Sequence, residues 1–115
     1  MQTMTHAARA YQAAATHRSQ REQEADVFQR ANGALKSARN AGPIPRVRAL
    51  ADNRRLWLTL ADLLGDPANA LPLELRASLL SIGLAVQREM DRDTPNFAFL
   101  IEINQNIAEG LSAIP

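Results

Sequence analysis

Hydrophobic residues recur at helical spacing in four segments of this chain, and short stretches rich in Pro, Gly, Asn and Asp separate the segments. Residues three and four apart lie on one face of an α-helix. No stretch of useful length alternates with a period of two, as a half-buried strand would. The pattern predicts an all-α fold: a small bundle of four to five helices joined by short loops.

Residues 46–64 are the most strongly patterned segment. Wound as a helix, they leave an apolar arc wider than half the circumference, which predicts a helix packed on several sides. Two polar residues, Asn53 and Arg54, fall inside this arc beside the only tryptophan, Trp57. Buried polar groups are costly unless they are hydrogen-bonded, so each should meet a partner on a neighbouring segment. The apolar residues of the arc are Val47, Leu50, Ala51, Leu56, Trp57, Leu58, Leu60, Ala61, Leu63 and Leu64.

A third helix is predicted over residues 72–91, after the Gly65-Asp66-Pro67 breaker. It carries two apolar stripes, and two stripes need two partners. A domain of this size has few helices to cover both. The first stripe comprises Leu75, Leu79, Ile82, Val86 and Met90, and the second comprises Leu73, Ala77, Leu80 and Leu84.

The last predicted helix, residues 96–111, is strongly amphipathic. Asn104 sits inside its apolar face, as Asn53 does in the helix over residues 46–64. We therefore predict that Asn53, Arg54, Trp57 and Asn104 organise the core.

The first 40 residues hold an alanine-rich segment around Tyr11 and a second apolar stripe that includes Phe28 and Leu35. Ser19 and Glu22 form a capping-box pattern, which predicts that a helix restarts there. One continuous helix over residues 5–39 is the alternative, because Gly33 weakens such a helix without forbidding it. We expect a single domain over residues 1–115, with a three-helix core at 46–111. The pattern leaves open whether the N-terminal helical region, 1–40, is mobile.

Composition excludes several classes of site. Without cysteine, the chain has no disulfides and no cysteine-ligated metal. No apolar run reaches the length of a signal peptide or a membrane span, so we expect a cytoplasmic protein. His6 and His17 have no acidic cluster at ligand spacing, and the glycines form no phosphate-binding loop. We expect no catalytic residues, no metal and no cofactor.

Charge is unevenly spread along the chain. Residues 1–60 hold ten basic and four acidic side chains, and residues 61–115 hold three basic and eight acidic ones, for a total of +1. The basic half could contact RNA, or the two halves could attract each other in the fold. No aromatic residues are interleaved with the basic ones for base stacking, so we do not expect direct nucleic-acid binding.

Several short motifs resemble one known family in order and spacing. They are Ala10-Tyr11-Gln12, Asn53-Arg54-Arg55-Leu56-Trp57 with Leu60 and Asp62, Asn69-Ala70-Leu71-Pro72 with Leu75-Arg76, and Leu100-Ile101-Glu102-Ile103-Asn104 with Ile107 and Gly110-Leu111. Together they cover nearly the whole chain and resemble the FlaF family of bacterial flagellar biosynthesis regulators. Residues 16–20 lack the proline that the family has there.

The resemblance implies a non-enzymatic cytoplasmic protein that binds flagellin as a chaperone and promotes its synthesis and secretion. It also implies a functional link to FlbT, a regulator of flagellin translation. A helical module with spare apolar grooves suits this role, since flagellin has amphipathic terminal segments. We expect Tyr11, Leu73, Leu80 and Leu84 to border the groove. An RNA-associated post-transcriptional regulator and a structural homodimer are the alternatives.

Overall fold

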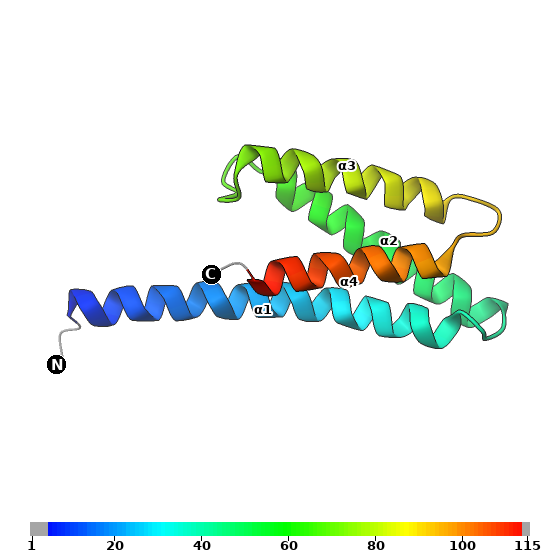
Figure 1. The fold of residues 1–115 in the computed structure, drawn as a ribbon, viewed down its shortest axis with the longest axis horizontal. Helices are drawn as coiled ribbons and strands as arrows, with labels where there is room; N and C mark the ends of the chain where they lie inside the picture. Colours follow the sequence, from blue (N-terminus) through cyan, green and yellow to red (C-terminus); the bar gives the residue numbers. More distant parts are fainter. Residues whose placement is uncertain (1–4, 114–115) are drawn as a thin grey trace.

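The computed structural model describes residues 5–113, with the side chains of 13–19 excepted, and in this range it contains four helices and no strand. They are α1 (His6–Ala38), α2 (Pro43–Gly65), α3 (Leu73–Met90) and α4 (Phe97–Ala113). Figure 1 shows two antiparallel pairs that cross: α4 lies along the second half of α1, and α3 lies along α2. The predicted all-α bundle is confirmed.

The N-terminal region forms one helix, α1, of 33 residues. Thr5 caps its start, with the Ala8 backbone N–H donating to Thr5 Oγ1 at 3.2 Å. The capping-box pattern at Ser19 and Glu22 therefore does not begin a new helix. Residues 16–20 contain neither Pro nor Gly, so nothing in this segment interrupts the backbone hydrogen bonds between the alanine-rich segment and the rest of α1.

The second helix begins at Pro43, three residues before the predicted start. Pro43 and Pro45 both lie in its first turn, where backbone N–H groups have no intrahelical acceptor and a proline loses no hydrogen bond. The two prolines that indicated a break thus belong to the helix itself.

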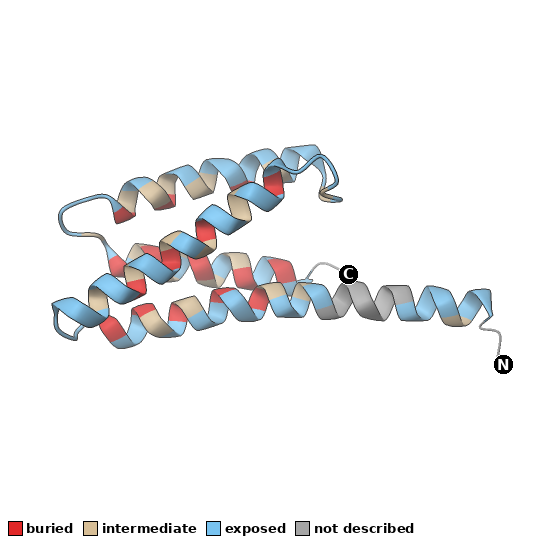
Figure 2. Cartoon of the chain, turned by 180° about the vertical axis from the view of Figure 1, so that it is seen from behind, coloured by how far each residue is buried: buried red, intermediate tan, exposed pale blue. Residues whose placement is uncertain are grey.

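The core lies between the second half of α1, α4 and the crossing helix α2, and Figure 2 shows the buried residues on the facing sides of these helices. The Phe28 and Trp57 rings meet edge to face, with centroids 5.6 Å apart. The three-helix core predicted for residues 46–111 is thus completed by residues 25–38 of α1. Apart from alanines, the buried apolar residues of this cluster are Phe28, Leu35, Trp57, Val86, Met90, Phe97, Leu100 and Leu111.

α2 packs against both α1 and α3, in line with its wide apolar arc, but the arc is not covered across its full width. Along α2, only Ala49, Asn53, Trp57 and Leu64 are buried. Val47, Leu58 and Leu63 are 65%, 53% and 54% exposed. The arc is wider than the two helices that pack along α2, namely α1 and α3, can cover. Part of the arc is therefore surface.

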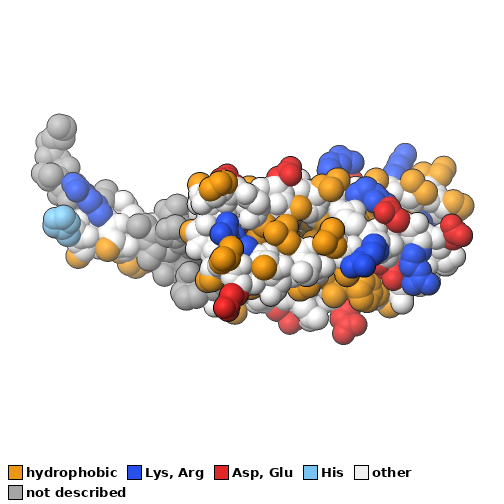
Figure 3. Space-filling view, turned by 90° about the horizontal axis from the view of Figure 1, so that it is seen from above, with side chains coloured by type: hydrophobic (Ala, Val, Ile, Leu, Met, Phe, Trp, Pro, Cys, Tyr) orange, Lys and Arg blue, Asp and Glu red, His pale blue; other side chains and the backbone are white. Residues whose placement is uncertain are grey.

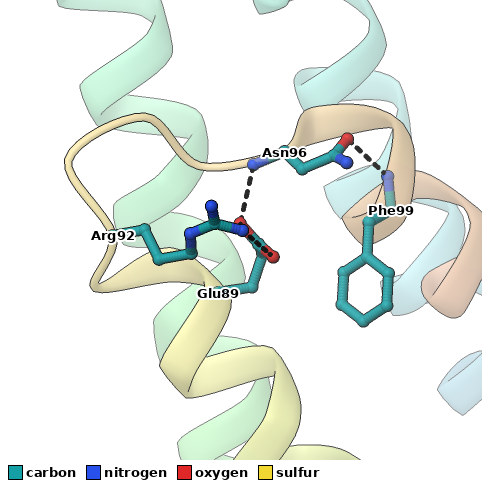
Figure 4. A network of polar contacts seen from close by, with 4 residues as sticks. All are labelled: Glu89, Arg92, Asn96 and Phe99. Carbon is teal, nitrogen blue, oxygen red and sulfur yellow. Dashed lines mark hydrogen bonds and ion pairs between the residues drawn. The ribbon is translucent and has the colours of Figure 1, made fainter.

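The connection from α3 to α4 is held by polar contacts that Figure 4 shows from close by. Glu89 accepts from the backbone N–H of Asn96 at 3.0 Å and pairs with Arg92 at 3.2 Å. Asn96 in turn accepts from the Phe99 backbone N–H at 3.1 Å, which caps the start of α4. Glu89 thereby couples the last turn of α3 to the first turn of α4.

Two glycines in helix interiors provide a test of this packing. A Cβ added at Gly33 meets nothing within 4 Å, whereas one at Gly83 lies 3.3 Å from Trp57 Cε3. We expect Gly33→Ala to raise the free energy of unfolding by about 0.5–1 kcal/mol, because alanine costs less backbone entropy in a helix. Gly83→Ala should gain less, or lose stability, since the Trp57 ring must give way. Urea unfolding of both variants measures the difference, and equal gains would contradict the close packing of Trp57 on Gly83.

Candidate partner-binding site

An apolar groove of about 340 Å³ runs between α2 and α3. Leu58 of α2 and Leu80 and Leu84 of α3 line it and are 53%, 37% and 64% exposed. Viewed from the α3 side, hydrophobic side chains gather along the middle of the molecule (Figure 3). No helix in residues 5–113 packs over this groove, so the second apolar stripe predicted for α3 has no partner in the described part of the chain.

Of the four residues expected to border one groove, the structure brings together Leu80 and Leu84. Leu73 is 73% exposed at the first position of α3 and is not among the residues that line the groove. Tyr11 is 70% exposed and belongs to the first turns of α1, which extend beyond the other helices in Figure 1. Tyr11 therefore lies on a different surface.

The floor of the groove is set by Trp57 and Gly83. The Trp57 ring rests against the Gly83 backbone, at a distance where any larger residue crowds it. Glycine in a helix interior costs about 1 kcal/mol relative to alanine. Our sequence analysis gave Gly83 no role. Its position inside a helix otherwise rich in leucine was the signal for a close approach.

A chain of buried hydrogen bonds holds Trp57 in place from the core side. Trp57 Nε1 donates to Asn104 Oδ1 at 2.9 Å, and Asn104 Nδ2 donates to Asn53 Oδ1 at 2.7 Å. Asn53 Nδ2 then donates to Met90 Sδ at 3.3 Å. All four side chains are at most 4% exposed. The chain ties α2 to α4 and to α3, so the two asparagines inside apolar faces hold the helices in register.

Arg54 sits at the rim rather than in the core. Its side chain is 38% exposed and pairs with Asp91 at 2.8 Å. It also donates to Gln87 Oε1 at 3.2 Å, and Gln87 lines the polar end of the groove. Arg54 thus links α2 to the last turns of α3 as a surface contact, which contributes at most about 1 kcal/mol.

Asn32 is a core-organising residue that our sequence analysis missed. It is 1% exposed, and its Nδ2 donates to the Ile101 backbone carbonyl of α4 at 3.0 Å. It lies between Phe28 and Leu35 on the apolar stripe of α1, which is the same signal that identified Asn53 and Asn104. Its Oδ1 is buried without a hydrogen-bond partner.

A second cavity, of about 180 Å³, opens where α1 and α2 diverge. Val27 of α1 and Leu63 of α2 line it and are 46% and 54% exposed. Leu111, near the end of α4, and Arg21 and Glu24 of α1 lie around the same cavity. This places the end of α4 level with Arg21 on α1.

The match to a known family covers this whole arrangement. The family model described as flagellar protein FlaF matches residues 7–111, which include nearly all of the four helices. The chain belongs to the FlaF family. This FlaF-family chain is accordingly a flagellar protein. No curated protein and no solved structure matches it.

Among the side chains of residues 5–12 and 20–113, no three His, Asp or Glu groups come together in a way that could hold a metal ion. Within residues 5–113, no helix is both long and apolar enough to cross a membrane.

The hydrogen-bond chain beneath the groove gives a graded prediction. Asn104→Ala leaves both Trp57 Nε1 and Asn53 Oδ1 buried without partners, so we expect a loss of about 3–5 kcal/mol in the free energy of unfolding. Asn53→Ala leaves Asn104 Nδ2 alone and should cost about 1–3 kcal/mol. Exposed Asn106, on the same helix α4, is the control, and Asn106→Ala should stay within about 0.5 kcal/mol of the unaltered protein. Urea unfolding checks this order, and a loss for Asn104→Ala no larger than for Asn106→Ala would contradict it.

Proposed function

We propose that this FlaF-family chain is a non-enzymatic flagellar regulator that binds flagellin as a cytoplasmic chaperone and promotes its synthesis and secretion for filament assembly. The observation that carries this proposal is the uncovered apolar groove between α2 and α3 in a protein of a flagellar family. The link to FlbT belongs to the same proposal.

The groove has the shape and chemistry that an amphipathic helix requires. Leu80 and Leu84 are four residues apart on α3 and present one ridge, and Leu58 faces them from α2. A helix laid between the two ridges would place its own residues at i, i+3, i+4 and i+7 against these leucines. The lining residues of α3 run from Leu79 to Gln87, about 12 Å of helix or two turns, which is enough to orient such a partner.

The rigidity of the floor favours binding. Trp57 is held by Asn104 beneath it and by Gly83 beside it, so the groove keeps its shape before a partner arrives. A preformed groove loses little conformational freedom on binding. Unpolymerised flagellin has terminal amphipathic segments that would otherwise pair prematurely, and covering such a segment is what a secretion chaperone does.

Four of the ten basic residues in residues 1–60 make ion pairs or a ring contact within the protein. Arg21 pairs with Glu24, Arg54 with Asp91, and Arg55 with Asp52. Arg46 lies over the Phe97 ring, 4.9 Å from its centroid. These contacts favour a protein partner over an RNA partner. A second copy of this chain could also occupy the groove, and the experiment below distinguishes it.

Two equally exposed apolar residues of the hairpin formed by α2 and α3 allow a matched test. Leu84 is 64% exposed and lines the groove, whereas Val47 is 65% exposed and lies outside it. We expect Leu84→Glu to weaken binding of purified monomeric flagellin by about 10–100-fold, because burying one leucine is worth about 1.5–3 kcal/mol. Val47→Glu should bind as the unaltered protein does. Isothermal titration calorimetry with monomeric flagellin measures both affinities.

Three outcomes would contradict the proposal. Unaltered flagellin binding by Leu84→Glu would exclude the groove between α2 and α3. Binding only to the flagellin messenger leader, falling steeply with salt, would indicate the RNA-associated regulator. A tight dimer of the free protein that dissociates on Leu80→Glu would indicate the homodimer.

A further inference from the structure

The first turns of α1 have no partner helix among the described residues. α1 has 33 residues and α4 has 17, so they are about 50 Å and about 26 Å long. Since α4 ends level with Arg21, residues 6–20 of α1, which we name the α1 arm, run on beyond it, as Figures 1 and 3 show.

The heptad positions of the face of α1 that packs on α4 can be followed towards the start of the helix, where Arg18 and Arg21 come first and Tyr11, Ala14 and Ala7 follow. Ala25 and Asn32 share one heptad position of this face, and Phe28 and Leu35 share the other; all four are buried. Tyr11 lies two heptads before Ala25, and Ala7 lies three heptads before Phe28. Tyr11 is nonetheless 70% exposed, and Ala7 is exposed too. The arm thus extends an existing helix interface past the point where its partner ends.

Charge indicates the kind of helix that fits there. The α1 arm carries two arginines, Arg9 and Arg18, and no acidic residue. The arm of a second copy would bring the same positive charge, so pairing of two arms is disfavoured. By contrast α4, the helix that occupies the rest of this interface, carries Glu102 and Glu109 and no basic residue. The occupant that matches the arm is therefore an acidic helix.

We infer that the α1 arm docks an acidic amphipathic helix of the protein partner, antiparallel to α1 and end to end with α4. Tyr11 is the central contact, since a tyrosine supplies a large contact area with few rotatable bonds. Small residues such as Ala7 let the two helices approach closely. The inference rests on the proposed function, because the partner is the protein that the groove between α2 and α3 holds. The arm and the groove are separate surfaces, so they bind one partner as two linked contacts.

The test uses the full chain and purified monomeric flagellin. We expect Tyr11→Glu to weaken binding at least about 10-fold, since it removes the central contact and adds a charge that repels an acidic helix. The matched control is Gln23→Glu, which adds the same charge at an exposed position of α1 two residues before Ala25, away from the heptad positions of the interface. It should leave the affinity unchanged. Urea unfolding should give both variants the stability of the unaltered protein, because neither residue belongs to the core.

The outcomes separate the arm from the groove. If Tyr11→Glu binds flagellin as tightly as Gln23→Glu does, while Leu84→Glu binds weakly, the inference about the arm is wrong and the proposed function stands. Absence of flagellin binding by the unaltered protein overturns both. If the protein self-associates in sedimentation experiments and Tyr11→Glu abolishes this, the arm binds a second copy of the chain. If the protein binds a short RNA and Tyr11→Glu abolishes this, the arm binds RNA. Either result overturns the inference.

Discussion

The buried indole N–H of Trp57 is the constraint on which the rest of this structure depends. A tryptophan that is 2% exposed fills the centre of the bundle, but its N–H must have an acceptor, and leaving it without one costs about 1–3 kcal/mol. Asn104 supplies that acceptor from α4, and its own amide then needs Asn53. Each hydrogen bond creates the need for the next, until the chain ends on the thioether of Met90. Because these residues come from three helices, one polar requirement sets the register of all three.

This constraint also explains why the groove lies where it does. α3 packs along α2 with its first stripe, where Gly83 meets the Trp57 ring and Met90 meets Asn53. Its second stripe then points away from the core, and α4 does not cover this stripe because α4 packs along α1. A bundle of four helices in which one pair crosses the other has more apolar surface than it can bury. Most of the large hydrophobic side chains that stay exposed lie on α2 and α3, and three of them, Leu58, Leu80 and Leu84, line the groove.

The two surfaces considered for binding differ in physical character. The groove between α2 and α3 is lined mainly by leucines, and a chain of buried hydrogen bonds holds Trp57 at its floor. The α1 arm is a single helix whose stability in water comes from its continuity with the packed half of α1, since starting a helix is costly and extending one is not. A partner that contacts both surfaces would be held in the groove between α2 and α3 and also along the length of the α1 arm.

Periodicity alone determined the all-α class, the approximate bounds of α3 and α4, and the positions of Asn53, Trp57 and Asn104 within apolar faces, because these depend on spacing along a single helix. The ordered motifs determined the family. Tertiary structure decided which apolar stripes are covered, since that depends on how many helices reach each face: Val47, Leu58 and Leu63 are apolar by sequence and exposed in the fold. It also decided that Tyr11 lies apart from Leu80 and Leu84, because α1 is continuous and carries Tyr11 beyond the end of α4. The roles of Asn32 and Gly83 had signals in the sequence, yet the atoms they contact, in Ile101 and Trp57, lie far away along the chain, and only folding brings them together.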